Sequence, residues 1–471
     1  MKDYVFKTFE TLKCKYVYDR SLDTIIRVSD DDYLEFSLLE QGIKNFNDSK
    51  VFLKFQKQGF FLKNNVERIE HPDLKYIKYY TSRRIEHMTL QVTQSCNLRC
   101  EYCIYSGAYK DQRTHSSKRM TWKVAKKAID FYLERSIDSK HLSIGFYGGE
   151  PLLEFDLIKQ CVRYLDEKVQ GKRIEYYITT NGTLLNENIF SFLSSYSFHI
   201  LISLDGNREE HNRHRRFISG EGSFDTIIDN IRKIKDKYPE ESKTISFNAV
   251  MTPQSDLVCM MDYFQIEDVL RDNYVMFSDV AESLGSTPDD DERFWRVRLF
   301  EYLKYYMSLI GKIDGSSVSV LARHSLNNVL MAYQQMRKRT VLTPCFHHNG
   351  PCIPGSTRIF VTVTGDLYPC QNVSELSDFF RIGNIETGFN YDRVTRILNN
   401  GALTSQECMD CWKLRLCNIC LQQVKHAGFD ITKKDKQKEC EHQEMRLLEY
   451  LQIISVLSEF GFDVEGIMQY E

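Results

Sequence analysis

The chain has 471 residues, enough for two or three domains. Its 62 basic and 65 acidic side chains give a net charge of −3, which provides no positive field for a phosphate backbone, so we expect no nucleic-acid partner. No apolar run approaches the ~20 residues that a membrane span needs, and the first residues do not resemble a signal peptide. We therefore expect a cytoplasmic protein with no membrane partner.

The first 80 or so residues predict a small domain of their own. Residues 13–29 indicate a β-hairpin, which is followed by helices at residues 31–42 and 49–59 and by a short strand at residues 60–62. This order is the outline of a winged helix. Because residues 1–75 hold 13 basic and 13 acidic side chains, a peptide added to an open sheet edge fits this domain better than DNA does.

Beyond this region the pattern changes to alternating strands and helices. Six strands are predicted, at residues 87–94, 141–149, 173–182, 198–206, 244–253 and 273–281. In one of the helices between them, Ile227, Ile231 and Ile234 form a single apolar stripe. The expected fold class is α/β, a parallel sheet curved into a partial (βα)6 barrel. Functional groups in such barrels collect at the carboxyl ends of the strands. An acidic stretch at residues 283–293 predicts a linker.

Cysteine is the unusual feature of the composition, with 14 in the chain. A large chain without an export signal is not expected to carry a disulfide framework, so clustered cysteines indicate metal or iron–sulfur ligands. Cys96, Cys100 and Cys103 form one group, and eight more lie between Cys345 and Cys440. Three others stand apart and are expected to have structural roles: Cys14, Cys161 and Cys259.

The first group has the spacing Cys96-x3-Cys100-x2-Cys103, with Tyr102 before the third cysteine, on the loop that leaves the first barrel strand. Three thiolates so placed can hold three irons of a [4Fe–4S] cube and leave the fourth iron open to a small molecule. A structural zinc site would need a fourth ligand, for which His115 is the nearest histidine. On these residues the chain resembles the radical S-adenosylmethionine (SAM) enzymes.

Other strand ends agree with this resemblance. Gly148, Gly149 and Glu150, followed by Pro151, resemble the family's GGEP motif, in which glycines admit the ligand and the carboxylate receives the methionyl ammonium. The resemblance implies further SAM contacts at three residues: Asn181, Ser203 and Arg215. It places Arg215 at the methionyl carboxylate, with its neighbour Arg216 as the alternative.

A second cysteine pattern resembles the SPASM extension, which carries two auxiliary [4Fe–4S] clusters on peptide-modifying radical SAM enzymes. It departs from that extension in having two residues rather than three before Cys420. The implied ligands of the first auxiliary cluster are Cys345, Cys352, Cys370 and Cys420. Those of the second are Cys408, Cys411, Cys417 and Cys440. With all ligands supplied by the protein, these clusters are expected to carry electrons.

The order of a winged helix, a radical SAM barrel and a SPASM extension resembles maturases of ribosomally made, post-translationally modified peptides (RiPPs). The implied domains are a RiPP recognition element at residues 1–82, the barrel at 83–282, linking helices at 283–344 and the SPASM domain at 345–471. The recognition element would take the precursor's leader as an added strand beside residues 15–19 and 24–28 and the helix near 51–58. The cysteine-rich core of the precursor would lie at the barrel mouth.

Residues 351–370 and 408–420 look more narrowly like the thioether-forming sactipeptide and ranthipeptide synthases. This resemblance implies an oxidoreductase with three [4Fe–4S] clusters, SAM and an electron donor such as flavodoxin or ferredoxin. A 5′-deoxyadenosyl radical would take hydrogen from a peptide carbon, and a cysteine sulfur would bond to that carbon while an electron leaves through the auxiliary clusters.

Four alternatives remain open. The same scaffold could form carbon–carbon crosslinks in a peptide or epimerise a residue. It could also serve an anaerobic sulfatase-maturating enzyme, although Gln371 stands where that family has an Asp base. A non-catalytic protein with zinc knuckles is the fourth. Glu375 and His348 lie near the segment where a general base is expected.

Overall fold

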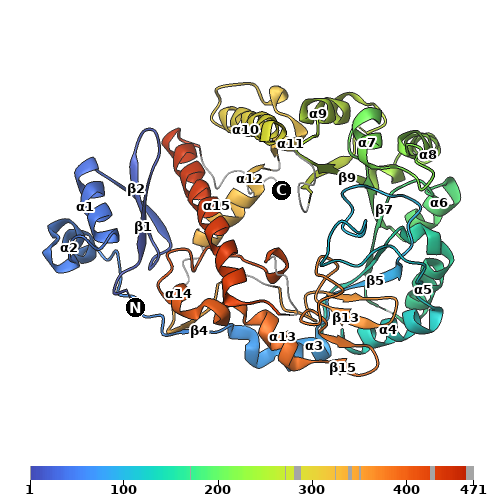
Figure 1. Ribbon diagram of the computed structural model, residues 1–471, viewed down its shortest axis with the longest axis horizontal. Coiled ribbons are helices and arrows are strands. Elements are labelled where there is room, and N and C mark those ends of the chain that lie inside the picture. Colours follow the sequence, from blue (N-terminus) through green and yellow to red (C-terminus); the bar gives the residue numbers. More distant parts are fainter. Residues whose placement is uncertain are drawn as a thin grey trace.

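The computed structural model describes residues 2–169, 171–270, 272–280, 288–323, 325–337, 342–348, 352–424 and 430–462. A small N-terminal sheet with two helices stands on one side, and a large sheet with its helices on the other (Figure 1). The long C-terminal helix α15 (Lys433–Glu459) lies between them. None of the helices within these ranges has the length and hydropathy needed to span a bilayer.

The large sheet has ten strands in the order β10-β9-β8-β7-β6-β5-β12-β13-β14-β15. The six strands predicted from the sequence lie side by side in chain order and are all parallel: β5 (His87–Thr93), β6 (Leu142–Gly148), β7 (Ile174–Thr180), β8 (His199–Ser203), β9 (Ile245–Met251) and β10 (Tyr274–Asp279). The predicted parallel α/β sheet is therefore confirmed. Its carboxyl ends meet at one edge, where a site can be assembled from several strands.

Helices cover the outer side of these strands (Figure 1). They are α4 (Trp122–Glu134), α5 (Phe155–Lys168), α6 (Glu187–Ser195), α7 (Arg208–His214), α8 (Phe224–Lys237) and α9 (Leu257–Ile266). The predicted stripe on α8 is buried, with Ile227, Ile231 and Ile234 at most 1% exposed. Each such side chain contributes roughly 1.5–3 kcal/mol relative to exposure in water, so this stripe holds α8 on the sheet.

The sheet continues into the C-terminal part of the chain. β12 (Ile359–Val361) pairs parallel with β5, and β13 (Asp366–Tyr368), β14 (Gly383–Asn384) and β15 (Gly388–Phe389) follow as antiparallel strands. All three residues of β12 are at most 1% exposed, as expected of a short apolar strand inside a sheet. The sheet thus joins residues 87–279 to residues 359–389 across the predicted SPASM boundary.

The N-terminal sheet has the order β1-β2-β3, with all pairs antiparallel. Its strands are β1 (Phe6–Glu10), β2 (Lys15–Asp19) and β3 (Thr24–Val28), followed by α1 (Asp30–Glu40) and α2 (Lys50–Lys57). The predicted strand at residues 60–62 is not formed, and β1 was not foreseen. Phe61 has a φ of 53°, outside the extended region, and its N–H donates to Asp19 Oδ2 at 2.8 Å.

Both faces of this small sheet are covered. Val17 on β2 packs with Phe36 of α1 and Phe52 of α2. Its neighbours Tyr16 and Tyr18 point the other way, into a core shared with α15 and α12 (Ser325–Arg337). The N-terminal domain is therefore packed against the C-terminal part of the chain.

The remaining elements connect these units. They are α3 (Ile77–Arg83), α10 (Pro288–Leu309), α11 (Val320–Arg323), α13 (Tyr391–Leu398), α14 (Ser405–Met409) and the parallel pair β4 (Arg68–Ile69) and β11 (Cys345–Phe346). Short 3-10 helices lie at Phe46–Asp48, Pro72–Tyr76, Pro151–Glu154, Glu241–Thr244, Gly315–Ser317, Asn400–Thr404 and Leu421–Gln423. Of the predicted linker, residues 288–293 begin α10 and residues 283–287 lie outside the described residues.

Candidate active site

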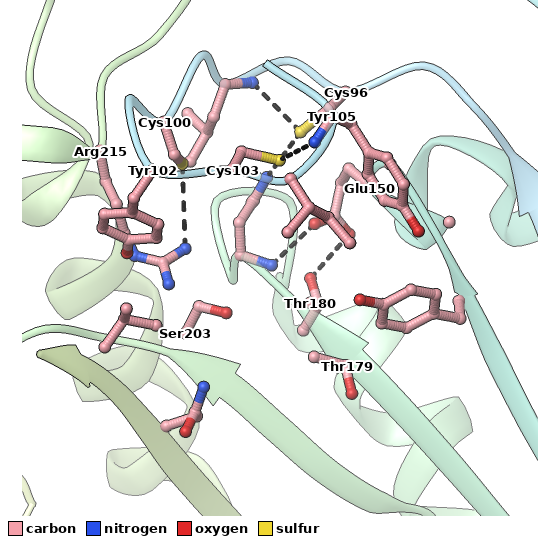
Figure 2. Close-up of a pocket in the computed structure, with 18 of the residues that line it drawn as sticks. Cys96, Cys100, Tyr102, Cys103, Tyr105, Glu150, Thr179, Thr180, Ser203 and Arg215 are labelled. Carbon is pink, nitrogen blue, oxygen red and sulfur yellow. Dashed lines mark hydrogen bonds between the residues drawn. The ribbon is translucent and has the colours of Figure 1, made fainter. Parts of the chain in front are cut away.

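A cavity of about 390 Å³ opens at the carboxyl edge of the parallel strands (Figure 2). Its walls come from the loop after β5 and from the ends of β6, β7 and β8. Apart from Arg216, the alternative to Arg215, every residue that the sequence suggested for the active cluster or for SAM lines it: Cys96, Cys100, Tyr102, Cys103, Gly148, Gly149, Glu150, Asn181, Ser203 and Arg215. Side chains distant in sequence thus share one cavity.

The loop after β5 directs three thiols at this cavity. Backbone N–H groups hold two of the sulfurs, from Leu98 to Cys96 Sγ at 3.4 Å and from Tyr105 to Cys103 Sγ at 3.4 Å. Burial raises the pKa of Cys96 to about 11 and that of Cys100 to about 12. Buried thiols need a positive partner to ionise, and a metal centre is such a partner.

The donor set fits an iron–sulfur cube better than a single zinc ion. His115 Nε2 lies 3.9 Å from Cys103 Sγ, so the structure does bring this histidine near the loop. Within the described ranges, however, no three His, Cys, Asp or Glu side chains converge on one point as ligands of a single ion. A cube takes one thiolate on each of three irons, so its ligands need not converge.

Gly148 and Gly149 let the end of β6 approach the cysteine loop. The Gly149 N–H donates to Thr93 O at 2.9 Å. A Cβ on Gly148 would lie 2.0 Å from Thr93 O, and one on Gly149 would lie 2.1 Å from Ser95 O. Any larger residue would force the two backbones apart, so both positions require glycine.

Glu150 joins the ends of β6 and β7. Its carboxylate, in a side chain 1% exposed, accepts hydrogen bonds from the Leu152 N–H at 3.0 Å, Thr180 Oγ1 at 2.7 Å and the Asn181 N–H at 2.7 Å. Burial raises the pKa of Glu150 to about 6. The network fixes this carboxylate at the cavity wall, where a ligand ammonium would complete its charge balance.

Asp205, which was not predicted from the sequence, orients Arg215, a cation that lines the cavity. Its carboxylate lies 2.9 Å from Arg215 Nε and accepts a hydrogen bond from the Tyr102 hydroxyl. Burial opposes ionisation, but the Arg215 guanidinium, His211 and the Tyr102 hydroxyl together outweigh it and lower the pKa of Asp205. Arg215 Nη1 lies 4.0 Å from Cys100 Sγ, whereas the alternative, Arg216, donates to Gly220 O on the exposed side. The sequence feature that could have identified Asp205 is the acidic residue in the motif Ser203-Leu204-Asp205-Gly206.

Four of the C-terminal cysteines form a second group. Burial raises the pKa of Cys411 to about 11, and the negative charges of Cys408 and Cys440 add to this effect. Burial likewise raises the pKa of Cys417 to about 12, with contributions from Cys411 and Cys408. The four predicted ligands of the second auxiliary cluster are thus near enough to influence one another's charge, although no three of them converge as ligands of a single ion in the described part of the chain.

A third group contains three of the four cysteines predicted to hold the first auxiliary cluster. Burial raises the pKa of Cys352 to about 11, with further contributions from Cys420 and Cys370. The fourth, Cys345, lies on β11, with its Sγ 3.6 Å from Arg68 Nη2 and 3.9 Å from the carbonyl oxygen of Glu70. Residues 349–351, between Cys345 and Cys352, lie outside the described residues.

Neither candidate general base lines the cavity. Glu375 accepts hydrogen bonds from Arg113 Nε and Gln91 Nε2, both at 2.6 Å, and ties the C-terminal segment to the barrel. His348 Nε2 lies 2.6 Å from Asn400 Oδ1, in a separate buried cluster. Among the isolated cysteines, Cys14 and Cys161 are buried as expected, but Cys259 is exposed on α9.

Residues 90–257 match the family model of the radical SAM superfamily. The chain contains a radical SAM domain. This domain carries the cysteine loop and all the cavity residues named above, and its family uses a [4Fe–4S] cluster and SAM. The protein is therefore an enzyme of radical chemistry.

Known proteins resemble the chain well beyond the radical SAM domain. The radical SAM cyclopropyl synthase TigE of Paramaledivibacter caminithermalis is 24% identical over 87% of this chain and 83% of its own length. A cysteine-type anaerobic sulfatase-maturating enzyme of Clostridium novyi is 25% identical over 72% of this chain and 87% of its own. Among solved structures, anSMEcpe with bound AdoMet has a TM-score of 0.56 at 22% identity, covering 80% of this chain and 96% of that one. The structural likeness establishes a shared fold.

Proposed function

We propose that this radical SAM enzyme joins cysteine sulfur atoms to carbon atoms of a ribosomally made, cysteine-rich precursor peptide. The observation that carries the proposal is the presence of two further groups of thiols, most of them partly buried, in addition to the one at the cavity. Forming a carbon–sulfur bond from a C–H and an S–H removes two hydrogens from the peptide. One hydrogen atom is transferred to the 5′-deoxyadenosyl radical, which becomes deoxyadenosine, and the thiol yields a proton and an electron. The additional thiol groups would hold clusters that accept this electron.

At the cavity, Cys96, Cys100 and Cys103 would hold a [4Fe–4S] cluster. When bound, this cluster supplies the electron that cleaves SAM into methionine and a 5′-deoxyadenosyl radical. Glu150 would receive the methionyl ammonium, and Arg215, oriented by Asp205, would receive the methionyl carboxylate. Three tyrosines that line the cavity, Tyr102, Tyr105 and Tyr147, would help to keep water from the radical.

The leader of the precursor would bind to the N-terminal sheet. β2 pairs with β1 on one side and β3 on the other, so of the two strands suggested by the sequence only β3 can accept another strand. The outer edge of β3 has no strand partner in the described parts of the chain. A peptide lying along β3 would use these free backbone groups.

Carbon–carbon bond formation in a peptide is the second candidate. The relative named a cyclopropyl synthase matches over 87% of this chain, which favours this possibility. Sulfatase maturation is favoured by the second relative. Gln371, in place of the acid that follows the corresponding cysteine in that family, argues against it.

The test is anaerobic incubation of the iron-reconstituted protein with SAM, a reductant and the precursor peptide encoded beside its gene. Mass spectrometry follows deoxyadenosine and the peptide. For each link, we expect the peptide to lose two hydrogens and one alkylatable thiol. The same mass loss with every thiol still alkylatable would replace thioether formation by carbon–carbon bond formation.

The control is the triple variant Cys96→Ala, Cys100→Ala, Cys103→Ala. It should form no deoxyadenosine but should still bind the leader, because β3 belongs to the small N-terminal sheet, on the other side of the molecule from the large sheet that carries the cavity (Figure 1). Persistent SAM cleavage by this variant would contradict the assignment of the active cluster.

A further inference from the structure

Two lysine side chains are buried beside the second auxiliary group, Cys408, Cys411, Cys417 and Cys440. Lys436 on α15 is 1% exposed, and Lys413, in the loop between Cys411 and Cys417, is 6% exposed. Lysine is almost never buried to this extent without a paired anion, because the ammonium loses its hydration. The anion that balances each lysine therefore has to be identified.

Lys413 has a partner within the protein. Its Nζ donates to Glu444 Oε2 and to the carbonyl oxygen of Cys440, both at 2.8 Å. Glu444 is partly exposed, so water shares in balancing this pair. Lys413 therefore acts on the cysteine group as a partly compensated charge.

Lys436 has no such partner. Its Nζ donates to the Asn400 carbonyl at 2.9 Å and lies 3.5 Å from His348 Nε2. Burial and the Lys436 charge hold the pKa of His348 well below its usual value, so this histidine is neutral. In the described parts of the chain, no Asp or Glu forms an ion pair with Lys436.

The second auxiliary group could provide the missing negative charge. Lys436 and Cys440 lie one turn apart on α15, so their side chains share a face of that helix. A cluster held by four thiolates is an anion, and it would balance Lys436 in a region with little water. The uncompensated lysine is thus a second indication, beside the four thiols, that an anionic group belongs here.

A third buried cation reaches the same loop from the N-terminal domain. Arg20 is 1% exposed, and its Nη1 donates to Met409 O at 2.8 Å and to Cys411 O at 3.1 Å. Its remaining bond, from Nη2 to Asn64 Oδ1 at 2.6 Å, is to a neutral amide. Positive charge therefore approaches this cysteine group from three separate segments.

The first auxiliary group has a different environment. Its thiols are those of Cys352, Cys370 and Cys420, and the cation that acts on them is Arg358. Arg358 is exposed to solvent, so water and salt screen its charge. The buried cations therefore distinguish the second group from the first.

We propose that Lys436, assisted by Lys413, raises the reduction potential of the cluster held by the second group above that of the first. The inference rests on the proposed function, because it assumes that both groups hold clusters. Reduction adds one negative charge, and a buried cation stabilises the more negative state. The electron released as the peptide's carbon–sulfur bond forms would then come to rest on the second group, while the thiol proton passes to solvent.

The experiment is a redox titration followed by electron paramagnetic resonance on the full chain carrying Cys96→Ala, Cys100→Ala and Cys103→Ala, so that auxiliary clusters alone contribute. Lys436→Met is added to this background. The matched control is Lys434→Met, which removes an exposed lysine from the same helix. We expect Lys436→Met to shift the higher of the two midpoint potentials to a more negative value, and Lys434→Met to shift neither.

Lys413→Met should shift the same midpoint in the same direction by less, because Glu444 already balances part of its charge. If Lys436→Met protein does not retain its iron, the Lys413→Met titration decides. If both auxiliary clusters are observed and neither lysine variant shifts a midpoint potential, this inference is overturned and the proposed function still stands. Absence of any iron–sulfur signal from the triple-cysteine background would instead contradict the cluster assignments of the proposed function.

Discussion

Asp205 illustrates how one buried side chain organises the cavity without being a proposed ligand of SAM or iron. Its Oδ2 engages Arg215 and Tyr102, and its Oδ1 accepts from the Val250 N–H at 3.0 Å. It therefore connects the cysteine loop, the segment after α7 and the end of β9. Such a group is a positioning residue, and its loss should act through Arg215.

Asp205→Asn should weaken SAM binding at least tenfold, or about 1.4 kcal/mol. The substitution keeps the shape but removes the negative charge that holds the Arg215 guanidinium, which is itself buried. Binding is measured anaerobically by calorimetry on reconstituted protein. Glu209→Gln, which removes an exposed carboxylate nearby on α7, is the control and should leave affinity unchanged. Equal SAM affinity in Asp205→Asn and wild type would show that Arg215 needs no orientation.

Most of the residues that sequence patterns placed at the cavity follow the carboxyl end of a strand with strong β character, whereas Arg215 follows helix α7. The parallel order of β5 to β8 then places Cys96, Glu150 and Ser203 at one edge. Asp205 was overlooked because an acid in a turn after a strand has many ordinary explanations. Whether such an acid is buried against Arg215 depends on tertiary packing, which the pattern does not encode.

At the scale of elements, the sequence separated units that the structure joins. Strand β12 is a three-residue apolar run, too short to distinguish from a loop, yet it extends the barrel sheet beside β5. Strand β1 was missed because the hairpin β2–β3 accounted for the obvious alternation. The strand expected at residues 60–62 was lost to the positive φ of Phe61, which has no signature in the sequence.

Gly149→Ala should abolish deoxyadenosine formation while leaving the fold intact. The added Cβ would lie 2.1 Å from Ser95 O, so the cysteine loop must move away from the end of β6. We expect a loss of at least a hundredfold, because reacting groups have to be held to well under 1 Å. Deoxyadenosine is quantified by chromatography, with thermal unfolding as the check on folding. Gly315→Ala, where the nearest side-chain atom is 3.4 Å from the new Cβ, is the control.

At the scale of the whole molecule, the N-terminal domain is fixed to the region of the second auxiliary group. The turn after β2 carries Asp23, which lies 3.1 Å from Arg415 Nε, and both side chains are 2% exposed. Arg415 Nη1 also donates to the carbonyl oxygen of Ser21 at 3.2 Å. Leader binding and auxiliary-cluster chemistry are therefore proposed for two units that share one buried junction.

Arg415→Met should destabilise this junction by about 3–5 kcal/mol, because it leaves the Asp23 carboxylate buried without its cation. Unfolding in guanidinium is followed through Trp412, whose ring lies 6.0 Å from that of Tyr18 at the junction. Arg396→Met is the control, since its pair with Asp430 is half exposed and is expected to contribute less than about 1 kcal/mol.

The double variant Asp23→Asn, Arg415→Met separates charge from packing at the same junction. The amide that replaces the Asp23 carboxylate carries no charge to leave uncompensated, so the double variant should be more stable than Arg415→Met alone. Equal stability of these two variants would mean that Arg415 acts through its packing and backbone hydrogen bonds rather than through Asp23. In either variant, loss of iron from the second group at denaturant concentrations below those that unfold the barrel would place that group within the unit that this junction stabilises.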